Sequence, residues 1–346
     1  MTYPEILKAS LQLEKDLINL DFESLPIHEG VKSYYRFDLT KIRYVSECNA
    51  FILFHILKNS SKTISDNLII DHGAGLGFFS FLVKRLGMQC ICHDISSEYI
   101  DGIKVIGKEL YSLPDHFVIG DTDALIQYCQ VNSLQPDGLG SRNVIEHIPD
   151  YKQFFSELNQ LSKPGFAAVI TTSANMHNPL VKRIHLKIHN QFENEGIITD
   201  MDNPTLNTSN CGIIMRSVLI RKHFPELNEN VIIQLAKLNR GYMEQEIIAR
   251  VSSYIQSGKL PAPFQEPSNT RDPATGAWVE RLVSYSNYKK AAESSLFQFE
   301  LVPGFYNTHY TSGIKNIVSQ VLNLILKIKN PWSVNLSPFL AMKLKK

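Results

Sequence analysis

Residues 67–82 read NLIIDHGAGLGFFSFL, and this stretch decides the fold. Residues 68–70 form a short apolar run that is typical of a strand buried on both faces, and the run stops at Asp71 and a cluster of glycines. From Phe78 onward the apolar positions follow a helical period. The sequence therefore predicts a strand, a tight turn and a helix, and a ligand can lie against the main-chain N–H groups of such a turn.

The spacing of the glycines limits the identity of that ligand. A nicotinamide or flavin dinucleotide fingerprint needs a third glycine at position 78, which is Phe, and a P-loop needs a G-K-[ST] that does not follow. The motif D-x-G-x-G-x-G resembles the first motif of class I S-adenosylmethionine (SAM)-dependent methyltransferases, whereas a tight turn without a ligand is the alternative. The resemblance implies SAM as cofactor, bound here by Asp71, His72, Gly73, Ala74, Gly75 and Gly77.

Acidic residues follow the next two predicted strands, residues 88–93 and 117–119. An acid at the end of the second strand, here Asp94, can accept hydrogen bonds from both ribose hydroxyls, a geometry that serves NAD and SAM alike. Ile95 is then expected against the adenine face. The resemblance further implies that Asp121 reads the adenine amino group, with Thr122 beside it in the cofactor site.

Residues 137–150 read DGLGSRNVIEHIPD and resemble the fourth-strand motif of small-molecule methyltransferases. By that resemblance Asn143 is a cofactor-binding residue and His147 lies beside the reacting end of the cofactor. The strand itself departs from the family pattern, because it contains two glycines and the charged Arg142. We expect this thin strand to reflect either a close approach of the cofactor's methionine end or merely a weak strand.

The expected fold class is α/β, a Rossmann-like seven-stranded class I methyltransferase sheet with a helical insertion that covers the substrate side. Residues 166–171 read as the fifth strand, 297–302 as the sixth and 338–343 as the seventh. The predicted organisation is N-terminal helices or lid at 1–64, a SAM-binding core at 65–174, a mostly helical insertion at 175–279 and completion of the sheet at 280–346.

Two helical segments, residues 3–22 and 46–58, precede the core, and a linker with Pro26 and Gly30 is expected between them. The family resemblance makes Tyr34, Tyr35 and Arg36 of this linker candidate lid residues. Ordinary packing of these side chains is the alternative.

Composition excludes several classes of protein. The net charge is +1 with 20% charged residues, so no global field attracts nucleic acid, and 44% hydrophobic residues suffice for a large core. The five cysteines are odd in number and scattered, which argues against a disulfide framework, and Cys90 and Cys92 are expected in the core. The N-terminus lacks a signal-peptide pattern, so a cytoplasmic location is expected.

The insertion contains a histidine pattern on one helix face. His185, His189 and Glu193 follow one another at i, i+4 and i+8. These three side chains are spread over two helical turns, about 12 Å, so one metal ion could not contact all three. At most two of them could bind an ion together with ligands from elsewhere in the chain, and the sequence by itself assigns no metal site. His189 is a second candidate for a substrate-facing base.

The segment 314–328 predicts an amphipathic helix that is too short and polar to span a bilayer. Internal packing, a homodimer interface and contact with a membrane surface are the open alternatives.

The chemistry depends on the acceptor of the methyl group. A hydroxyl is a poor nucleophile until it is deprotonated, and His147 is the first candidate base. Residues 173–179 and 272–281 resemble methyltransferases of bacterial surface-glycan synthesis, so we expect a small-molecule acceptor, a sugar or nucleotide-sugar hydroxyl. A non-catalytic SAM-binding module and an NAD-dependent Rossmann oxidoreductase are the alternatives, and Phe78 opposes the latter.

Overall fold

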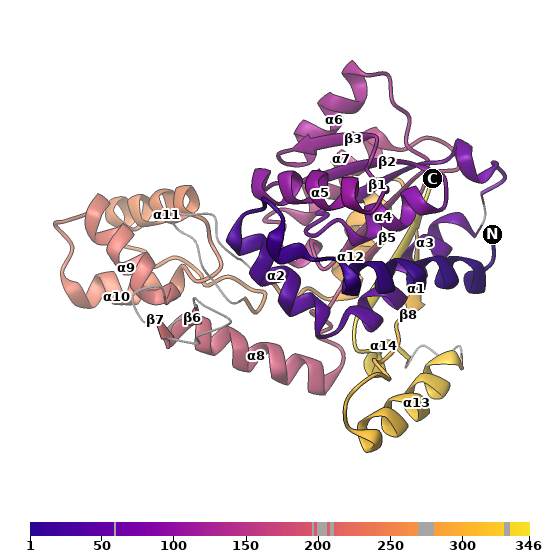
Figure 1. Ribbon diagram of the computed structural model, residues 1–346. Helices are drawn as coiled ribbons and strands as arrows, with labels where there is room; N and C mark the ends of the chain where they lie inside the picture. The colour runs from indigo at the N-terminus through magenta and orange to yellow at the C-terminus, as the bar shows by residue number, and fades with distance from the viewer. Residues whose placement is uncertain (59, 196, 199–205, 208–210, 269–279, 329–332) are drawn as a thin grey trace. The chain divides into compact units, whose positions relative to one another are not determined.

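The structure is a computed structural model, shown in Figure 1, that describes residues 1–58, 60–195, 197–198, 206–207, 211–268, 280–328 and 333–346. The chain divides into two compact units. The core unit comprises Met1–Ile145, Asp150–Ser173 and Tyr285–Lys346, and the inserted unit comprises Glu146–Pro149 and Ala174–Ser284.

The core unit is built around a seven-stranded sheet with the order β3-β2-β1-β4-β5-β9-β8. The strands are β1 (Leu68–His72), β2 (Gln89–Asp94), β3 (His116–Ile119), β4 (Gly138–Arg142), β5 (Ala167–Thr172), β8 (Gln298–Pro303) and β9 (Leu340–Lys345). The first five are parallel, and β9 runs antiparallel to both β5 and β8. The predicted seven-stranded α/β sheet is therefore confirmed, with its sixth and seventh strands at the C-terminus.

Helices cover both faces of this sheet (Figure 1). Those of the core unit are α1 (Tyr3–Asn19), α2 (Glu29–Leu39), α3 (Ile42–Leu57), α4 (Phe78–Arg85), α5 (Ser97–Glu109), α6 (Thr122–Val131), α7 (Tyr151–Leu161), α12 (Tyr285–Ser294), α13 (Gly313–Lys327) and α14 (Ser333–Leu336). Helices α1, α3 and α4 contact one another, and α7 contacts both α6 and α12. Asp71 of β1 contacts α4 and His72 contacts α7, so these two groups lie on opposite faces.

The predicted linker between the N-terminal helices is wrong, because helix α2 forms within it. The His28 side chain caps this helix by accepting a hydrogen bond from the Gly30 amide at 3.1 Å. Gly30 thus lies in the first turn, where a glycine does little to disfavour a helix. Of the three candidate lid residues, Tyr35 is buried and donates to the Leu17 carbonyl, and Arg36 pairs with Glu23.

The two glycines of the fourth strand, β4, are explained by packing. A Cβ added at Gly140 would lie 2.6 Å from ring atoms of Phe79 on α4 and 3.0 Å from Ile52 on α3. A Cβ at Gly138 would lie 2.4 Å from Ile56 on α3. Glycine is therefore required at both positions because two helices lie directly against β4. Gly140 also lines the cavity described below, so a close approach of the cofactor stays a prediction.

The inserted unit is mostly helical, with α8 (Pro179–Asn194), α9 (Gly212–His223), α10 (Glu229–Leu238), α11 (Glu244–Ser257) and two short strands, β6 (Ile197–Ile198) and β7 (Leu206–Asn207). Its apolar core includes Leu219, Ile220, Leu235 and Ile247. The Arg216 side chain is fully buried, donates to the Ala236 carbonyl at 2.7 Å and pairs with Glu193.

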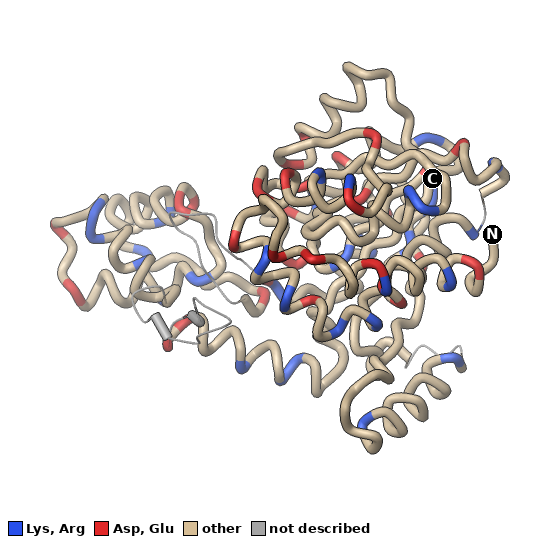
Figure 2. The backbone as a smooth tube through the Cα atoms, viewed as in Figure 1, with Lys and Arg blue, Asp and Glu red and all other residues tan. Residues whose placement is uncertain are grey.

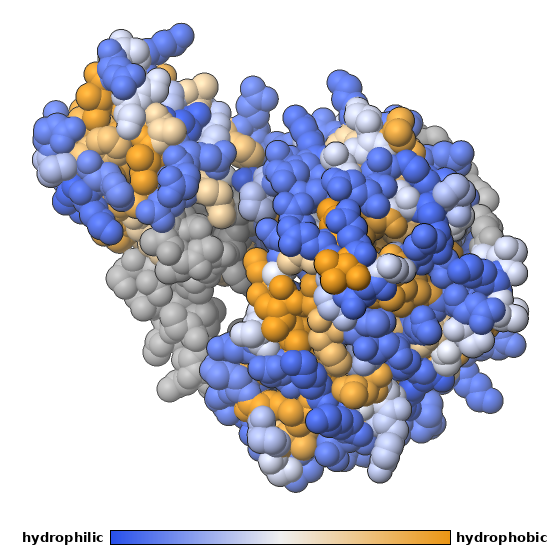
Figure 3. All heavy atoms as spheres, turned by 90° about the horizontal axis from the view of Figure 1, so that it is seen from above, coloured by the Kyte–Doolittle hydropathy of each residue, from blue (hydrophilic) through white to orange (hydrophobic). Residues whose placement is uncertain are grey.

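The surface mixes charges of both signs. Figure 2 shows Lys and Arg interspersed with Asp and Glu along the backbone, and the face in Figure 3 alternates between hydrophobic and hydrophilic residues. Helix α13 differs, because Ile314, Ile317 and Leu324 are 77%, 63% and 62% exposed. The described residues therefore leave this apolar face uncovered. Among those residues, no helix combines the length and apolar character needed to cross a membrane.

Candidate cofactor site

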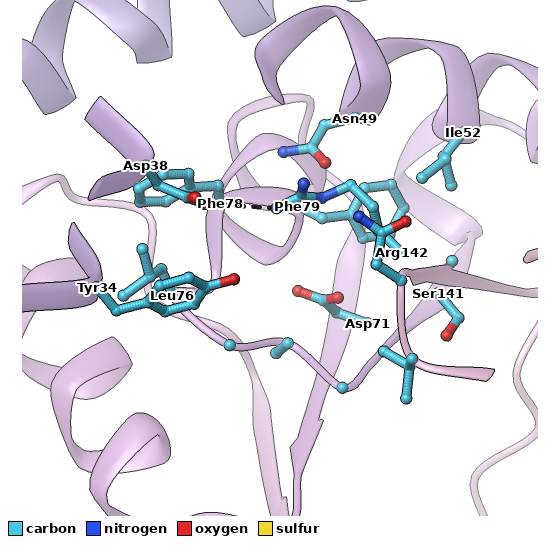
Figure 4. Close-up of a pocket in the computed structure, with 16 residues that line it drawn as sticks. Tyr34, Asp38, Asn49, Ile52, Asp71, Leu76, Phe78, Phe79, Ser141 and Arg142 are labelled. Carbon is cyan, nitrogen blue, oxygen red and sulfur yellow. Dashed lines mark ion pairs between the residues drawn. The ribbon is translucent and has the colours of Figure 1, made fainter. Parts of the chain in front are cut away.

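A cavity opens in the core unit beside the carboxyl ends of β1 and β4 (Figure 4). Strand β1 has β2 on one side and β4 on the other, so this is the point where the strand order reverses. The lining residues are Tyr34, Asp38, Asn49, Ile52, Asp71, Gly73, Ala74, Gly75, Leu76, Phe78, Phe79, Gly140, Ser141, Arg142, Asn143 and Val144. Ligands of open α/β sheets bind at such reversal points.

The glycine turn after β1 forms one wall of the cavity. Gly73, Gly75 and Gly77 all have positive φ, and Gly77 is the N-cap of α4. A Cβ at Gly73 would lie only 2.4 Å from Val144, so the turn and the segment after β4 approach each other too closely for a side chain. The tight turn predicted from the sequence is therefore present, and its backbone lies at the cavity.

Asp94, at the end of β2, is hydrogen-bonded both to the glycine turn and to the loop that follows β2. Its carboxylate accepts hydrogen bonds from the Gly75 amide at 2.8 Å and from the Ser96 amide at 2.9 Å. A carboxylate offers about four acceptor positions, so two remain for further donors. The neighbouring Ile95 is 77% exposed, which leaves its apolar surface available to a flat ring.

Asp71 is a buried acid of the cavity. It accepts hydrogen bonds from the Ser80 amide at 3.0 Å and from the Ser80 hydroxyl at 2.7 Å. Burial raises the pKa of Asp71 to about 7, although both hydrogen bonds oppose this shift. In Figure 4 the Asp71 carboxylate and the Tyr34 hydroxyl both point into the cavity. Asp71 thus changes charge near neutral pH.

Polar side chains from the N-terminal helices and from β4 line the opposite wall of the cavity. Arg142 lies 3.6 Å from the Asp38 carboxylate, and Lys41 contacts the same carboxylate at 3.0 Å. The buried Asn49 has no hydrogen-bond partner for its Oδ1 among the described residues. Sequence reasoning missed Asp38 and Asn49, because no motif marks the helices that carry them. Arg142 was recognised only as a departure from the family pattern.

His72 lies on the other face of β1. Its ring stacks on that of His93 with centroids 5.0 Å apart, and its Nδ1 is 3.2 Å from the Ser141 hydroxyl. Burial lowers the pKa of both histidines, which favours their neutral forms. The side chain of His72 therefore supports the floor of the site, and only its backbone adjoins the glycine turn.

Asp121 and Thr122 lie at the end of β3. Asp121 caps α6 by accepting from the Ala124 amide at 3.0 Å, and its carbonyl oxygen is 3.1 Å from His93 Nε2. Like Asp94 and Ile95, these two residues do not line the cavity, so the roles of all four toward ribose and adenine stay predictions. Asn143 does line it, with a φ of 58° at the end of β4.

The two candidate bases both belong to the inserted unit. His147 ends a short 3-10 turn, Ile145–His147, and is half-buried, four residues along the chain from Asn143. His189 is completely buried on α8 beside Glu280. Their catalytic roles stay predictions.

The cavity suits a zwitterionic ligand that also carries a cationic group. Arg142 supplies a fixed positive charge for a carboxylate, whereas Asp71 and the unpartnered Asn49 Oδ1 offer acceptors for an ammonium group. SAM combines these groups with an adenosine, for which Asp94 retains free acceptor positions. The residues present therefore fit SAM.

Comparison with known proteins agrees with this geometry. Residues 46–207 match a family model described as a methyltransferase domain. A search of curated protein sequences gives no significant match. The matched stretch contains the glycine motif and strands β1 to β5, so this part of the chain is a methyltransferase domain, and its sheet order is that of class I enzymes, which use SAM as cofactor.

Solved structures with a similar arrangement include two SAM-dependent methyltransferases. The one from Mesorhizobium loti is 12% identical with a TM-score of 0.38, and the match covers 82% of this chain and 94% of that one. The one from Archaeoglobus fulgidus is 15% identical with a TM-score of 0.40, covering 90% and 99%. At these identities and scores they add nothing to the assignment, which rests on the family match and the site.

Proposed function

We propose that the chain transfers the methyl group of SAM to a hydroxyl group of a small molecule, a sugar or a nucleotide sugar. The observation that supports this proposal is the cavity at the glycine turn, which Asp71 and Arg142 line, while Asp94 accepts a hydrogen bond from the Gly75 amide of that turn. The near-neutral charge, with both signs interspersed, gives no support to a polyanionic acceptor (Figure 2).

Support for an oxygen acceptor comes from two sequence features. The residues that follow β4 begin with Asn143 and Val144 and lack the N/D-P-P-Y/F motif of amino-directed enzymes. Residues 173–179 resemble glycan methyltransferases, and in the structure Asn178 of this segment caps α8 by accepting from the Leu180 amide at 3.0 Å. Most of the second similar segment, 272–281, lies outside the described residues.

Bound SAM supplies an electrophilic methyl group on its sulfonium, and the protein has to align it with the acceptor. In this proposal Arg142, Asn49 and the glycine turn hold the cofactor, and Asp94 receives its ribose. His147 acts as general base and takes the proton of the acceptor hydroxyl on a ring nitrogen. The inserted unit, which the chain enters directly after β5, is proposed to determine which acceptor binds.

The test offers the purified chain SAM with a deuterated methyl group and a pool of nucleotide sugars, followed by mass spectrometry. The proposal expects one labelled methyl group on a sugar hydroxyl, and much less label with Asp94→Asn. Label only on an added amine or peptide pool would contradict the oxygen-directed proposal. SAM binding without any transfer would favour the non-catalytic alternative.

The remaining proposals concern location and partners. We keep a cytoplasmic location as a proposal that rests on the sequence alone. The uncovered apolar face of α13 supports either a homodimer or contact with a membrane surface, and no acidic residue lies within this helix.

A further inference from the structure

A compact group of three side chains lies inside the inserted unit. His185 and His189 stand one turn apart on α8, and Glu280 approaches them from a distant part of the chain. Glu280 Oε1 contacts His185 Nδ1 and lies 3.6 Å from His189 Nε2. One potential ligand atom from each residue lies within 4.8 Å of the other two. An ion bound at about 2 Å from each atom needs these atoms within about 4 Å of one another, so small side-chain rotations would complete the site.

Hydrogen bonds fix the backbone on both segments that supply this group, the one next to Glu280 and helix α8. Next to Glu280, the Arg281 amide donates to the Glu146 carbonyl at 2.9 Å, and the Leu282 amide donates to the Pro267 carbonyl at 2.8 Å. On α8, Arg240 donates to the His189 carbonyl at 3.2 Å. The three side chains are therefore presented by anchored segments, as a metal site requires.

The environment of His189 points to a missing ligand. Its side chain is 0% exposed, and neither ring nitrogen makes a hydrogen bond within the described part of the chain. A buried polar group without a hydrogen bond is costly unless something else binds it. A metal ion would bind a ring nitrogen of His189 and remove that cost.

Glu193, which shares the helix face in the sequence pattern, does not belong to this group. It pairs with the buried Arg216 and lies 3.9 Å from Arg240. Its charge is thereby compensated, and the i+8 position contributes no ligand, in agreement with the span expected from helix geometry. Glu280 takes its place, and the sequence could not show this because Glu280 is remote along the chain.

We propose that His185, His189 and Glu280 bind one divalent transition-metal ion of the Zn²⁺ type. Two imidazoles and a carboxylate are a donor set that Zn²⁺ and related ions favour over Mg²⁺ or Ca²⁺. Three protein ligands leave at least one coordination position for water or another ligand. This site lies within the inserted unit, and the proposal does not depend on the methyl acceptor.

The test is calorimetric titration of the full-length, EDTA-treated chain with Zn²⁺. The proposal expects one ion per chain and a loss of affinity of at least about 100-fold in His185→Ala and Glu280→Gln, since even indirect partners of metal ligands change affinity by 10- to 100-fold. His223→Ala is the matched control, because His223 pairs with Glu244 at 3.9 Å in the same unit without a third donor. The control variant should bind Zn²⁺ with the same affinity as the unchanged chain.

A second measurement does not depend on the folding of any variant. Co²⁺ added to the unchanged chain should give the visible absorption of a low-symmetry nitrogen and oxygen site, and an equivalent of Zn²⁺ should remove it. Circular dichroism establishes that the variants are folded. Absence of binding to the unchanged chain, or equal binding by the folded variants, would overturn the proposal.

Discussion

The ionisation of Asp71 predicts a pH dependence of cofactor binding. Burial raises its pKa to about 7 in the free protein, so about half of the chains carry the charge at pH 7 and about 1% at pH 5. The ammonium and sulfonium groups of SAM favour the ionised carboxylate. Binding should therefore lower the pKa of Asp71 and release a proton.

The size of the effect follows from the ionised fraction. If SAM binds the ionised form only, its affinity falls about 50-fold between pH 7 and pH 5, which corresponds to about 2.3 kcal/mol. His72 does not contribute, because burial lowers its pKa well below the ordinary value of 6.5. The α-amino group of the ligand stays charged throughout, since such groups titrate at about pH 8.

Isothermal calorimetry measures the affinity for SAM at each pH. Repeating the titration in buffers of different ionisation enthalpy measures the number of protons released on binding. Asp71→Asn should remove most of the pH dependence, whereas Asp123→Asn, a change at an exposed acid, should retain it. An affinity of the unchanged chain that is constant from pH 5 to pH 7 would refute the reasoning, as would a full pH dependence in Asp71→Asn.

Three further predictions concern other parts of the structure. Asp94→Asn should weaken SAM binding by about 1.5–3 kcal/mol, because charge-assisted hydrogen bonds are lost, and unchanged affinity in calorimetry would exclude Asp94 from the site. Gly140→Ala should lower the free energy of unfolding in urea by about 1–3 kcal/mol, since its Cβ would meet Phe79 at 2.6 Å, whereas Gly313→Ala, with open space around it, should not. His147→Ala should leave SAM affinity unchanged and reduce turnover by about 10²–10⁴-fold, so unchanged turnover would reject His147 as the base.

The same pKa shift affects stability. The folded-state pKa of Asp71 lies above the ordinary value of 3.8, so between about pH 4 and pH 7 the folded chain holds a proton that the unfolded chain has lost. The contribution of Asp71 to stability is therefore present at low pH and declines as pH rises through this window, by at most about 1.4 kcal/mol per pH unit. Asp71→Asn should remove that decline in urea unfolding.

The sequence predicted those parts of the fold that local patterns determine. The strand before Asp71, the glycine turn and the acid at Asp94 each follow from residues that are adjacent in the chain, and the structure contains all three. The two terminal strands could be placed because their apolar runs are short and clearly bounded.

Other features depend on contacts between remote segments. Asp38 and Asn49 reach the cavity only because α2 and α3 pack against the sheet, and no local signal marks them. The glycines of β4 suggested either a close approach of the cofactor or a weak strand, and the sequence did not indicate that they admit two helices. The linker prediction was wrong because Gly30 lies in the first turn of a helix, where the His28 side chain accepts a hydrogen bond from its amide.

The most direct test of the central claim is calorimetric titration of the purified chain with SAM, S-adenosylhomocysteine and NAD. Binding of both sulfur-containing ligands at one site per chain, with no binding of NAD, is the expected result. Binding of NAD without either sulfur-containing ligand would contradict the assignment of the cavity to SAM.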